Sequence, residues 1–259
     1  MNLHDVLVVY MRPDTAAGRR TLEIVKQTLL HAGVAALIVE RNRVDQKCCW
    51  QKDLIITVGG DGTFLRASHF VEDVPMLGVN SEPKRKVGFF TRSTAQDFAE
   101  KFQRLRNGKY HLRQLPRLKV HIDGDEIPER ALNEVFFGDR LPFKMCRYQL
   151  RVEGKKEEQR SSGVLISTGA GSHAWMQSAG GKRFSLTAEK MEFLVREPYH
   201  DLNRKGMLHQ GFTNRKIHLL SRDTNNFLVI DALSKTYPMP VGSRATIELA
   251  KRKIQMVDF

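Results

Sequence analysis

The stretch DLIITVGGDGTFLRASHF, residues 53–70, decides the fold. It starts with an apolar and β-branched run, passes through Gly-Gly-Asp-Gly-Thr, and resumes with a second apolar segment. A short apolar run that stops at glycines is typical of a buried strand, and the residues that follow carry a helical pattern. The stretch therefore predicts a strand, a tight glycine turn and a helix.

Around this stretch, the first 114 residues alternate short apolar runs with longer amphipathic segments. The expected strands cover residues 6–11, 34–40, 54–60 and 76–80, and the expected helices cover residues 18–33 and 94–109. Such β-α-β alternation predicts a parallel sheet with helices on both faces. We expect residues 1–114 to form an α/β phosphate-binding domain.

After Pro116 the pattern changes to short apolar strands separated by Asp/Gly and Glu/Gly turns. The expected strands lie within residues 117–128, 131–137, 148–158, 163–168, 216–221, 227–232 and 245–250. Hairpin turns of this kind predict a mainly antiparallel sheet structure. We expect residues 115–259 to form a second, β-rich domain.

The composition limits the function classes. Of the 259 residues 41% are hydrophobic, and no run approaches the roughly 18 apolar residues that a membrane span needs. The three cysteines have no CxxC spacing, which predicts reduced thiols and neither a disulfide framework nor a metal site. The N-terminus lacks the features of a signal peptide and reads as a first strand, so we expect a cytoplasmic location without a membrane partner.

The formal net charge of +13 indicates an anionic ligand. Basic clusters at residues 84–86, 155–156 and 251–253 are short and lack interleaved aromatic residues. Aromatic side chains are what stack on bases in single-stranded nucleic acids. The pattern favours a small phosphate-rich ligand over specific nucleic-acid binding, and a solvated surface is the simpler alternative for many of these charges.

The glycine turn is suited to phosphate. Ligands of parallel sheets bind beyond the carboxyl ends of the strands, where glycines permit close approach and a helix N-terminus offers N–H donors. Asp61 does not fit a plain phosphate turn, because its carboxylate repels phosphate unless it binds a metal or accepts a proton. The alternative is that Asp61 caps the helix. The motif is neither a Walker A loop nor GxGxxG.

Three motifs in series resemble the NAD kinase family: GGDGT, then Asn133-Glu134 within ALNEVFF, then SSGVLISTGAGSHAWMQSAGG at residues 161–181. The resemblance implies Mg²⁺-dependent phosphoryl transfer from ATP or polyphosphate to the 2′-hydroxyl of the adenosine ribose of NAD, and a homo-oligomer, a dimer or a tetramer. GGDGT is shared with diacylglycerol and sphingosine kinases. A lipid or other small-alcohol kinase, and a non-catalytic NAD- or nucleic-acid-binding protein, are therefore the alternatives.

The resemblance also implies roles for individual residues. Asp61 would be the general base, and the second domain would bind NAD. The residues implied in binding are Gly59, Gly60, Gly62 and Thr63 at the phosphates, Phe89 near the adenine, Asn133 and Glu134 at the adenosine and ribose, Ser162 near the nicotinamide-side ribose, and Thr168, Gly171, Ser172, His173, Ala174 and Trp175 in the wall of the NAD site. Lys84, Arg85 and Lys86 would serve ATP or polyphosphate.

The third motif, at residues 161–181, departs from the family pattern. Ser162 stands where the family has an aspartate, His173 where it has a threonine, and Trp175 where it has a tyrosine. This version is similar to the divergent branch that includes mitochondrial-type NAD kinases. A carboxylate expected near the nicotinamide-side ribose is thereby replaced by a neutral hydroxyl.

Overall fold

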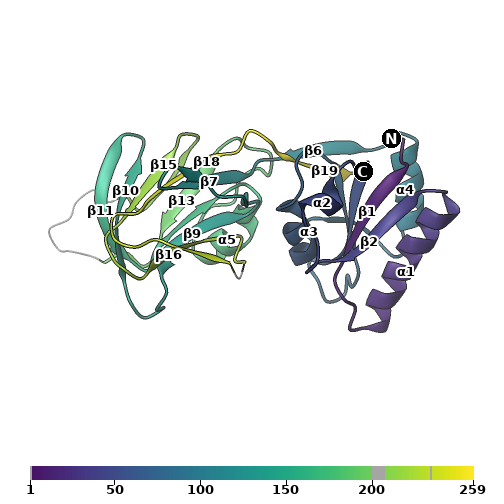
Figure 1. Ribbon diagram of the computed structural model, residues 1–259, viewed down its shortest axis with the longest axis horizontal. Helices are drawn as coiled ribbons and strands as arrows, with labels where there is room; N and C mark the ends of the chain where they lie inside the picture. The colour runs from purple at the N-terminus through teal and green to yellow at the C-terminus, as the bar shows by residue number, and fades with distance from the viewer. Residues whose placement is uncertain (1, 200–207, 234) are drawn as a thin grey trace. The chain divides into compact units, whose positions relative to one another are not determined.

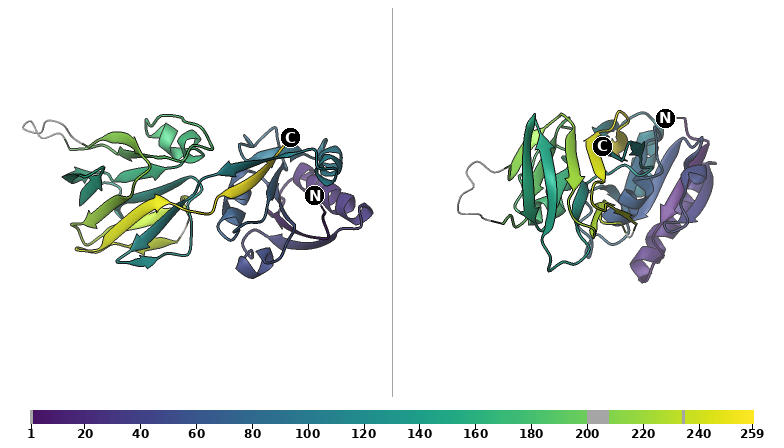
Figure 2. Two further views of the ribbon diagram at one scale, coloured as in Figure 1. Left: turned by 90° about the horizontal axis from the view of Figure 1, so that it is seen from above. Right: turned by 60° about the vertical axis from the view of Figure 1, so that its left-hand side comes forward.

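The computed structural model describes residues 2–199, 208–233 and 235–259. The chain forms two compact units: unit 1 comprises Met1–Gln114 and Lys253–Phe259, and unit 2 comprises Leu115–Arg252. We expected the second domain to run to Phe259, but the last seven residues belong to unit 1. The reason is strand pairing, because β19 (Ile254–Asp258), the yellow strand at the C-terminus in Figure 2, pairs with β4 (Met76–Asn80) in the first sheet.

Unit 1 is built on a seven-stranded sheet with the order β2-β1-β3-β4-β19-β6, and β5 also pairs with β4. Its further strands are β1 (Asp5–Tyr10), β2 (Ala35–Glu40), β3 (Leu54–Gly59), β5 (Thr91–Thr94) and β6 (His111–Leu115). β1 pairs in parallel with β2 and β3, and β3 pairs in parallel with β4. The carboxyl ends of these strands therefore lie at one edge of the sheet, which is where parallel sheets bind ligands.

Helices flank this sheet (Figure 1). They are α1 (Ala16–His31), α2 (Gln46–Cys49), α3 (Asp61–Ser68) and α4 (Phe98–Arg106). Thr15 caps α1 by accepting a hydrogen bond from the backbone N–H of Gly18 at 3.0 Å. One core cluster joins Leu22 and Val25 of α1 and Phe98 and Phe102 of α4 to strand residues such as Ile56. This apolar packing fixes the strand ends that carry the glycine turn.

Unit 2 is a sandwich of two six-stranded sheets. The first sheet contains β11 (Lys155–Ser161), β10 (Cys146–Val152), β15 (Ile217–Ser221), β18 (Arg244–Leu249), β7 (Leu118–Ile122) and β8 (Asp125–Glu126), in that order. The second contains β14 (Gln210–Thr213), β13 (Met191–Val195), β12 (Val164–Ser167), β9 (Glu134–Asp139), β16 (Asn226–Ile230) and β17 (Thr236–Pro238). The pairings are antiparallel, as the hairpin signals predict.

The second sheet of unit 2 is apolar on both faces. Val135 and Phe137 of β9 face the inner core of the sandwich, whereas Phe136 between them joins a separate cluster on the other face. That cluster includes Met176 of the short helix α5 (Trp175–Ser178), which follows the 3₁₀ turn η1 (Gly171–His173). The segment after β12 thus turns back and covers the outer face of the sheet.

Candidate active site

The glycine turn joins β3 directly to α3. β3 is buried along its whole length, Gly60 is the N-cap residue, and α3 begins at Asp61. A Cβ at Gly59 would lie 2.2 Å from Thr63 Oγ1, and a Cβ at Gly60 would lie 3.0 Å from Lys86 Cδ. A side chain at Gly59 would therefore collide with Thr63, and one at Gly60 would press on the Lys86 side chain. The predicted strand, turn and helix are all present.

Asp61 does not cap α3. No side chain caps this helix, and Asp61 Oδ1 instead accepts a hydrogen bond from the backbone N–H of Phe90 at 2.7 Å. Within the part of the chain that the structure describes, Oδ2 has no hydrogen-bond partner. The carboxylate is held by one oxygen and offers the other, which is the arrangement that a proton acceptor needs.

Thr63 and Phe89 support this turn from two sides. The Thr63 hydroxyl is buried against Gly59 and has no hydrogen-bond partner among the described residues. Phe89 is half-buried and packs edge-on against Phe90 at 5.1 Å, and Phe90 stacks on Phe64 of α3 at 5.1 Å. The structure therefore brings Phe89 to the residues around Asp61, and its contact with an adenine stays a prediction.

Of the three basic residues after β4, Lys86 reaches the glycine turn. Its side chain lies over Gly60 and forms an ion pair with the buried Glu82, which also pairs with Arg85 at 3.0 Å. Lys84 is exposed. That all three serve ATP or polyphosphate stays a prediction, and in the structure two of them, Arg85 and Lys86, are paired with Glu82.

Arg41 is a cation of this region that the sequence analysis missed. It directly follows β2, and its Nη1 lies 4.0 Å from the position of a Cβ at Gly62. The available signal was its position, because residues that follow neighbouring parallel strands meet at one edge of the sheet. Arg41 adds positive charge beside the exposed glycine of the turn.

In unit 2, the Asn133-Glu134 dipeptide is anchored by Asp231. The Asp231 carboxylate is buried and accepts hydrogen bonds from the backbone N–H groups of Leu132, Asn133 and Glu134 at 2.8, 2.8 and 2.9 Å. Asp231 has a positive φ of 50°, a conformation that aspartate tolerates better than most residues. Sequence analysis treated Asp231 as the end of a strand and missed this role.

Thr168 and Gly171 lie against the same dipeptide. Thr168 donates its backbone N–H to the Asn133 carbonyl at 2.9 Å and its hydroxyl to the Leu132 carbonyl at 2.6 Å. A Cβ at Gly171 would lie 2.2 Å from the Asn133 carbonyl oxygen, so only glycine fits there. The structure thus brings together the second and third sequence motifs, which are about 35 residues apart in the chain.

Two buried polar atoms of this cluster lack partners among the described residues: Asn133 Oδ1 and Glu134 Oε2. Burial, with a smaller effect of the Asp231 carboxylate, raises the pKa of Glu134 to about 8. The Glu134 carboxyl is therefore mostly protonated at neutral pH and can donate a hydrogen bond. Unsatisfied buried polar atoms are rare in proteins, and a pair of them beside a glycine-rich segment indicates a ligand site.

The remaining members of the third motif have different surroundings. Ser172 is fully buried, donates its hydroxyl to the Gly169 carbonyl at 2.7 Å and accepts from Phe184 N–H at 3.1 Å, so it holds the turn together. His173 and Ala174 are half-buried. Trp175 packs on Phe136 at 5.0 Å on the outer face of the second sheet.

Ser162 lies apart from Asn133 and Thr168. It precedes β12 and Thr168 follows it, and a strand of four residues is about 13 Å long. Ser162 N–H instead donates to the Arg196 carbonyl at 3.0 Å, and the Arg196 guanidinium lies 5.5 Å from the Trp175 ring. Ser162 therefore neighbours the Trp175 end of the motif, and its role in NAD binding stays a prediction.

No helix in the described residues is long and apolar enough to cross a membrane. The same residues contain no group of three or more His, Cys, Asp and Glu side chains placed to hold a metal ion.

A glycine turn after a parallel strand, at the N-terminus of a helix and beside cations, is an arrangement suited to binding phosphate. Residues 5–110 match the family model of the ATP-NAD kinase N-terminal domain. A probable NADH kinase from Oryza sativa subsp. japonica is 30% identical over 233 residues, which cover 82% of this chain and 71% of the relative. An NAD kinase from Pyrococcus furiosus is 30% identical over 211 residues, covering 80% and 73%. The chain belongs to the NAD kinase family.

Solved structures agree on the fold. An NAD kinase from Archaeoglobus fulgidus, solved in complex with ATP, has a TM-score of 0.79 at 24% identity and matches 98% of this chain and 93% of its own. Yeast NADH kinase, complexed with NADH, has a TM-score of 0.83 at 17% identity, with 99% and 84% matched. The predicted family, fold class and enzyme class, an NAD kinase, are confirmed. Family membership decides against the lipid kinase alternative.

Proposed function

We propose that this protein transfers a phosphoryl group from ATP to the 2′-hydroxyl of the adenosine ribose of NAD or NADH. The observation that supports it most is the state of Asp61, which lies at the start of α3 with Oδ1 held by Phe90 and Oδ2 free. Within hydrogen-bond reach of a hydroxyl, such a carboxylate accepts the proton as the oxygen attacks phosphorus. A general base of this kind contributes about 10²–10⁴-fold in rate.

The rest of unit 1 would position the phosphates. Phosphoryl transfer has a loose transition state, so the protein contributes mainly orientation and charge stabilisation. The N–H groups at the start of α3, the Lys86 ammonium and the Arg41 guanidinium supply this positive potential. ATP and polyphosphate both present the phosphate chain that such a site binds, so the donor must be tested with both.

Mg²⁺ usually binds through substrate phosphates and one or two carboxylates and retains several waters. The described residues contain no cluster of three or more acidic or other metal-binding side chains, and Asp61 supplies one carboxylate at the turn. These residues fit a magnesium ion that binds together with the donor. When bound, it would neutralise charge on the transferred phosphoryl group.

Unit 2 would bind the dinucleotide. Glu134, protonated at neutral pH, can donate a hydrogen bond, and Asn133 Oδ1 can accept one. Adenine and ribose offer acceptors and donors that match both. Thr168, Gly171 and Ser172 form the backbone wall beside this pair.

The oxidation state of the acceptor is a separate question. Both NAD kinases and NADH kinases occur among the similar proteins, and the rice relative that matches most of this chain is named a probable NADH kinase. NADH is therefore the second candidate acceptor. A cytoplasmic location and assembly into a dimer or tetramer stay predictions.

The test uses the purified full chain with Mg²⁺, either NAD or NADH, and either ATP or polyphosphate. The product NADP or NADPH is quantified with a dehydrogenase specific for the phosphorylated form. We expect product that depends on both the acceptor and the donor. Binding of NAD without turnover under all four combinations would instead favour the non-catalytic alternative.

A further inference from the structure

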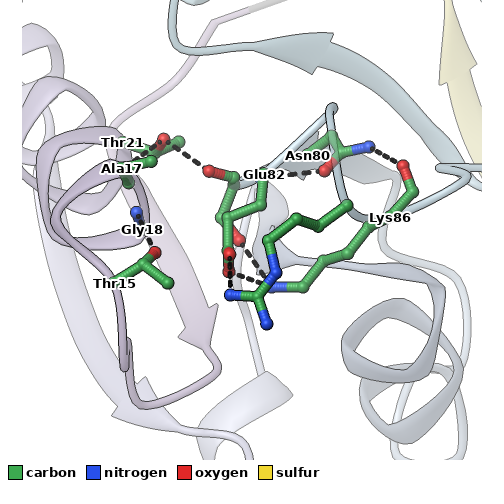
Figure 3. Close-up of polar contacts among 9 residues, drawn as sticks. Thr15, Ala17, Gly18, Thr21, Asn80, Glu82 and Lys86 are labelled. Atoms are coloured by element: carbon green, nitrogen blue, oxygen red, sulfur yellow. Dashed lines mark hydrogen bonds and ion pairs between the residues drawn. The ribbon is translucent and has the colours of Figure 1, made fainter.

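The segment between β4 and β5 is folded onto the glycine turn by backbone contacts. Ser81 N–H donates to the Gly59 carbonyl at 3.0 Å. Asn80 Oδ1 accepts from Glu82 N–H at 3.0 Å, and Asn80 Nδ2 donates to the Lys86 carbonyl at 3.1 Å, as Figure 3 shows. Asn80 therefore closes residues 80–86 into a loop that is fixed beside the turn.

Glu82 is the buried anion of this loop. Its side chain is 4% exposed, and its carboxylate lies between α1 and the basic residues of the loop (Figure 3). Lys86 and Arg85 both donate to it, and a hydrogen bond from Thr15, the N-cap residue of α1, adds to them. The Lys86 hydrogen bond is the main cause that lowers the pKa of Glu82. The Glu82 carboxylate is thus ionised and accepts hydrogen bonds from all three of these side chains.

Lys86 uses two of its three N–H donors to hold its position within the protein. Its Cδ packs against Gly60, and its Nζ, two bonds further on, donates to Glu82 Oε1 and to Ser81 Oγ at 3.2 Å. An ammonium group has three N–H donors. The third has no partner among the residues that the structure describes, and the side chain keeps 22% of its surface exposed. A fixed, charged donor therefore remains available next to the glycine turn.

We propose that Glu82 is a positioning residue for the phosphate donor: it fixes Lys86 over Gly60 so that the third N–H of the ammonium binds a donor phosphate oxygen. The proposal rests on the proposed function of the turn and adds the residue that determines its affinity for a polyphosphate chain. A free lysine loses much side-chain entropy when it binds a ligand, whereas Lys86 has already lost it on folding. Arg85, with 64% of its side chain exposed, contributes only weaker steering.

The test measures binding of inorganic tripolyphosphate and of ATP to the full-length chain by calorimetry, without NAD. Lys86→Met should weaken both about tenfold, as expected for loss of a charged hydrogen bond. Glu82→Gln should weaken both at least about threefold, because the amide holds the ammonium less firmly. In the Lys86→Met background, Glu82→Gln should cause no further loss of tripolyphosphate or ATP binding, since Glu82 acts through Lys86.

Lys101→Met is the matched control. Lys101 pairs with Asp97 at the same i,i+4 spacing, and its side chain is also 22% exposed. Its loss should leave tripolyphosphate binding within about twofold of wild type, while circular dichroism checks folding of every variant. In steady-state assays the KM for ATP should rise in Glu82→Gln and Lys86→Met, and the KM for NAD should stay within about twofold.

Tripolyphosphate binding that is unchanged or tighter in Glu82→Gln would overturn the proposal. A further loss of tripolyphosphate binding when Glu82→Gln is added to Lys86→Met would also overturn it. If Glu82→Gln does not fold, Lys86→Met decides alone, and an unchanged affinity rejects the role of the ammonium. Tripolyphosphate binding that depends on Lys86, without any phosphorylation of NAD or NADH, would contradict the proposed function but keep this inference. Full turnover together with unaltered donor binding in Lys86→Met would contradict this inference but keep the proposed function.

Discussion

Glu134→Gln should stabilise unit 2, and the gain should grow as the pH rises. The Glu134 carboxyl is 3% exposed, and its pKa is about 8 in the folded protein against 4.5 as the ordinary value. The folded state therefore holds this proton more tightly than the unfolded state does. Below pH 4.5 the carboxyl is protonated in both states, so its protonation does not change the folding stability. Between pH 4.5 and pH 8 the unfolded chain ionises first, so folding stability falls with rising pH.

The size of the effect follows from the two pKa values. Each pH unit within this window costs about 1.4 kcal/mol, so the cost at pH 7 is about 3 kcal/mol and at pH 5 below about 1 kcal/mol. Glutamine has nearly the same shape and no charge to bury. The free energy of unfolding of Glu134→Gln relative to wild type should therefore rise by about 2–3 kcal/mol from pH 5 to pH 7.

Urea unfolding followed by tryptophan fluorescence measures this difference. The chain has two tryptophans, and Trp50→Phe leaves Trp175 as the reporter of unit 2. Glu126→Gln, which removes a more exposed carboxyl from the same unit, controls for the change in net charge. A stability difference for Glu134→Gln that is flat or falling between pH 5 and pH 8 would refute the assignment of a buried, protonated Glu134.

Three further variants test the site. Asp61→Asn should lower kcat at least about 100-fold while calorimetric NAD affinity stays near wild type, and retention of a tenth of the activity would exclude Asp61 as the base. Asp231→Asn cannot accept all three N–H bonds at residues 132–134 and should destabilise unit 2 by about 1–3 kcal/mol in urea unfolding; an unchanged midpoint would count against the anchor. Ser162→Asp should change the affinity for NAD more than that for ATP, and equal effects would contradict its assignment to the NAD site.

Much of unit 1 follows from local sequence signals. Apolar runs ending in turn residues located β1, β2, β3 and β4 to within a residue or two, and the glycine turn located the start of α3. The return of β19 to this sheet could not be predicted in the same way. Its partner β4 lies almost 180 residues earlier in the chain, and strand pairing over that distance leaves no local pattern.

The candidate site was predicted in part. Asp61, Asn133 and Thr168 were named because three motifs in series resemble the NAD kinase family, and their roles stay predictions. Asp231 and Glu82 were missed for a shared reason. Each acts on backbone or side-chain groups whose proximity depends on the fold. In the sequence, Asp231 looks like the end of a strand and Glu82 like an acidic residue of a turn.

The two buried glutamates show how the fold sets chemistry that residue type does not. Glu82 receives hydrogen bonds from Lys86 and Arg85 and stays ionised, so it can hold a cation at the phosphate turn. Glu134 has no cation partner among the described residues, lies near the Asp231 carboxylate and stays protonated near neutral pH, so it can donate to a ligand. The opposite pKa shifts of these two glutamates follow from their surroundings: the hydrogen bond from Lys86 lowers the pKa of Glu82, whereas burial, with a smaller effect of Asp231, raises that of Glu134. Under the proposed function, the paired lysine beside Glu82 would bind an anionic phosphate chain, and the protonated Glu134 would bind the neutral hydrogen-bonding groups of a nucleoside.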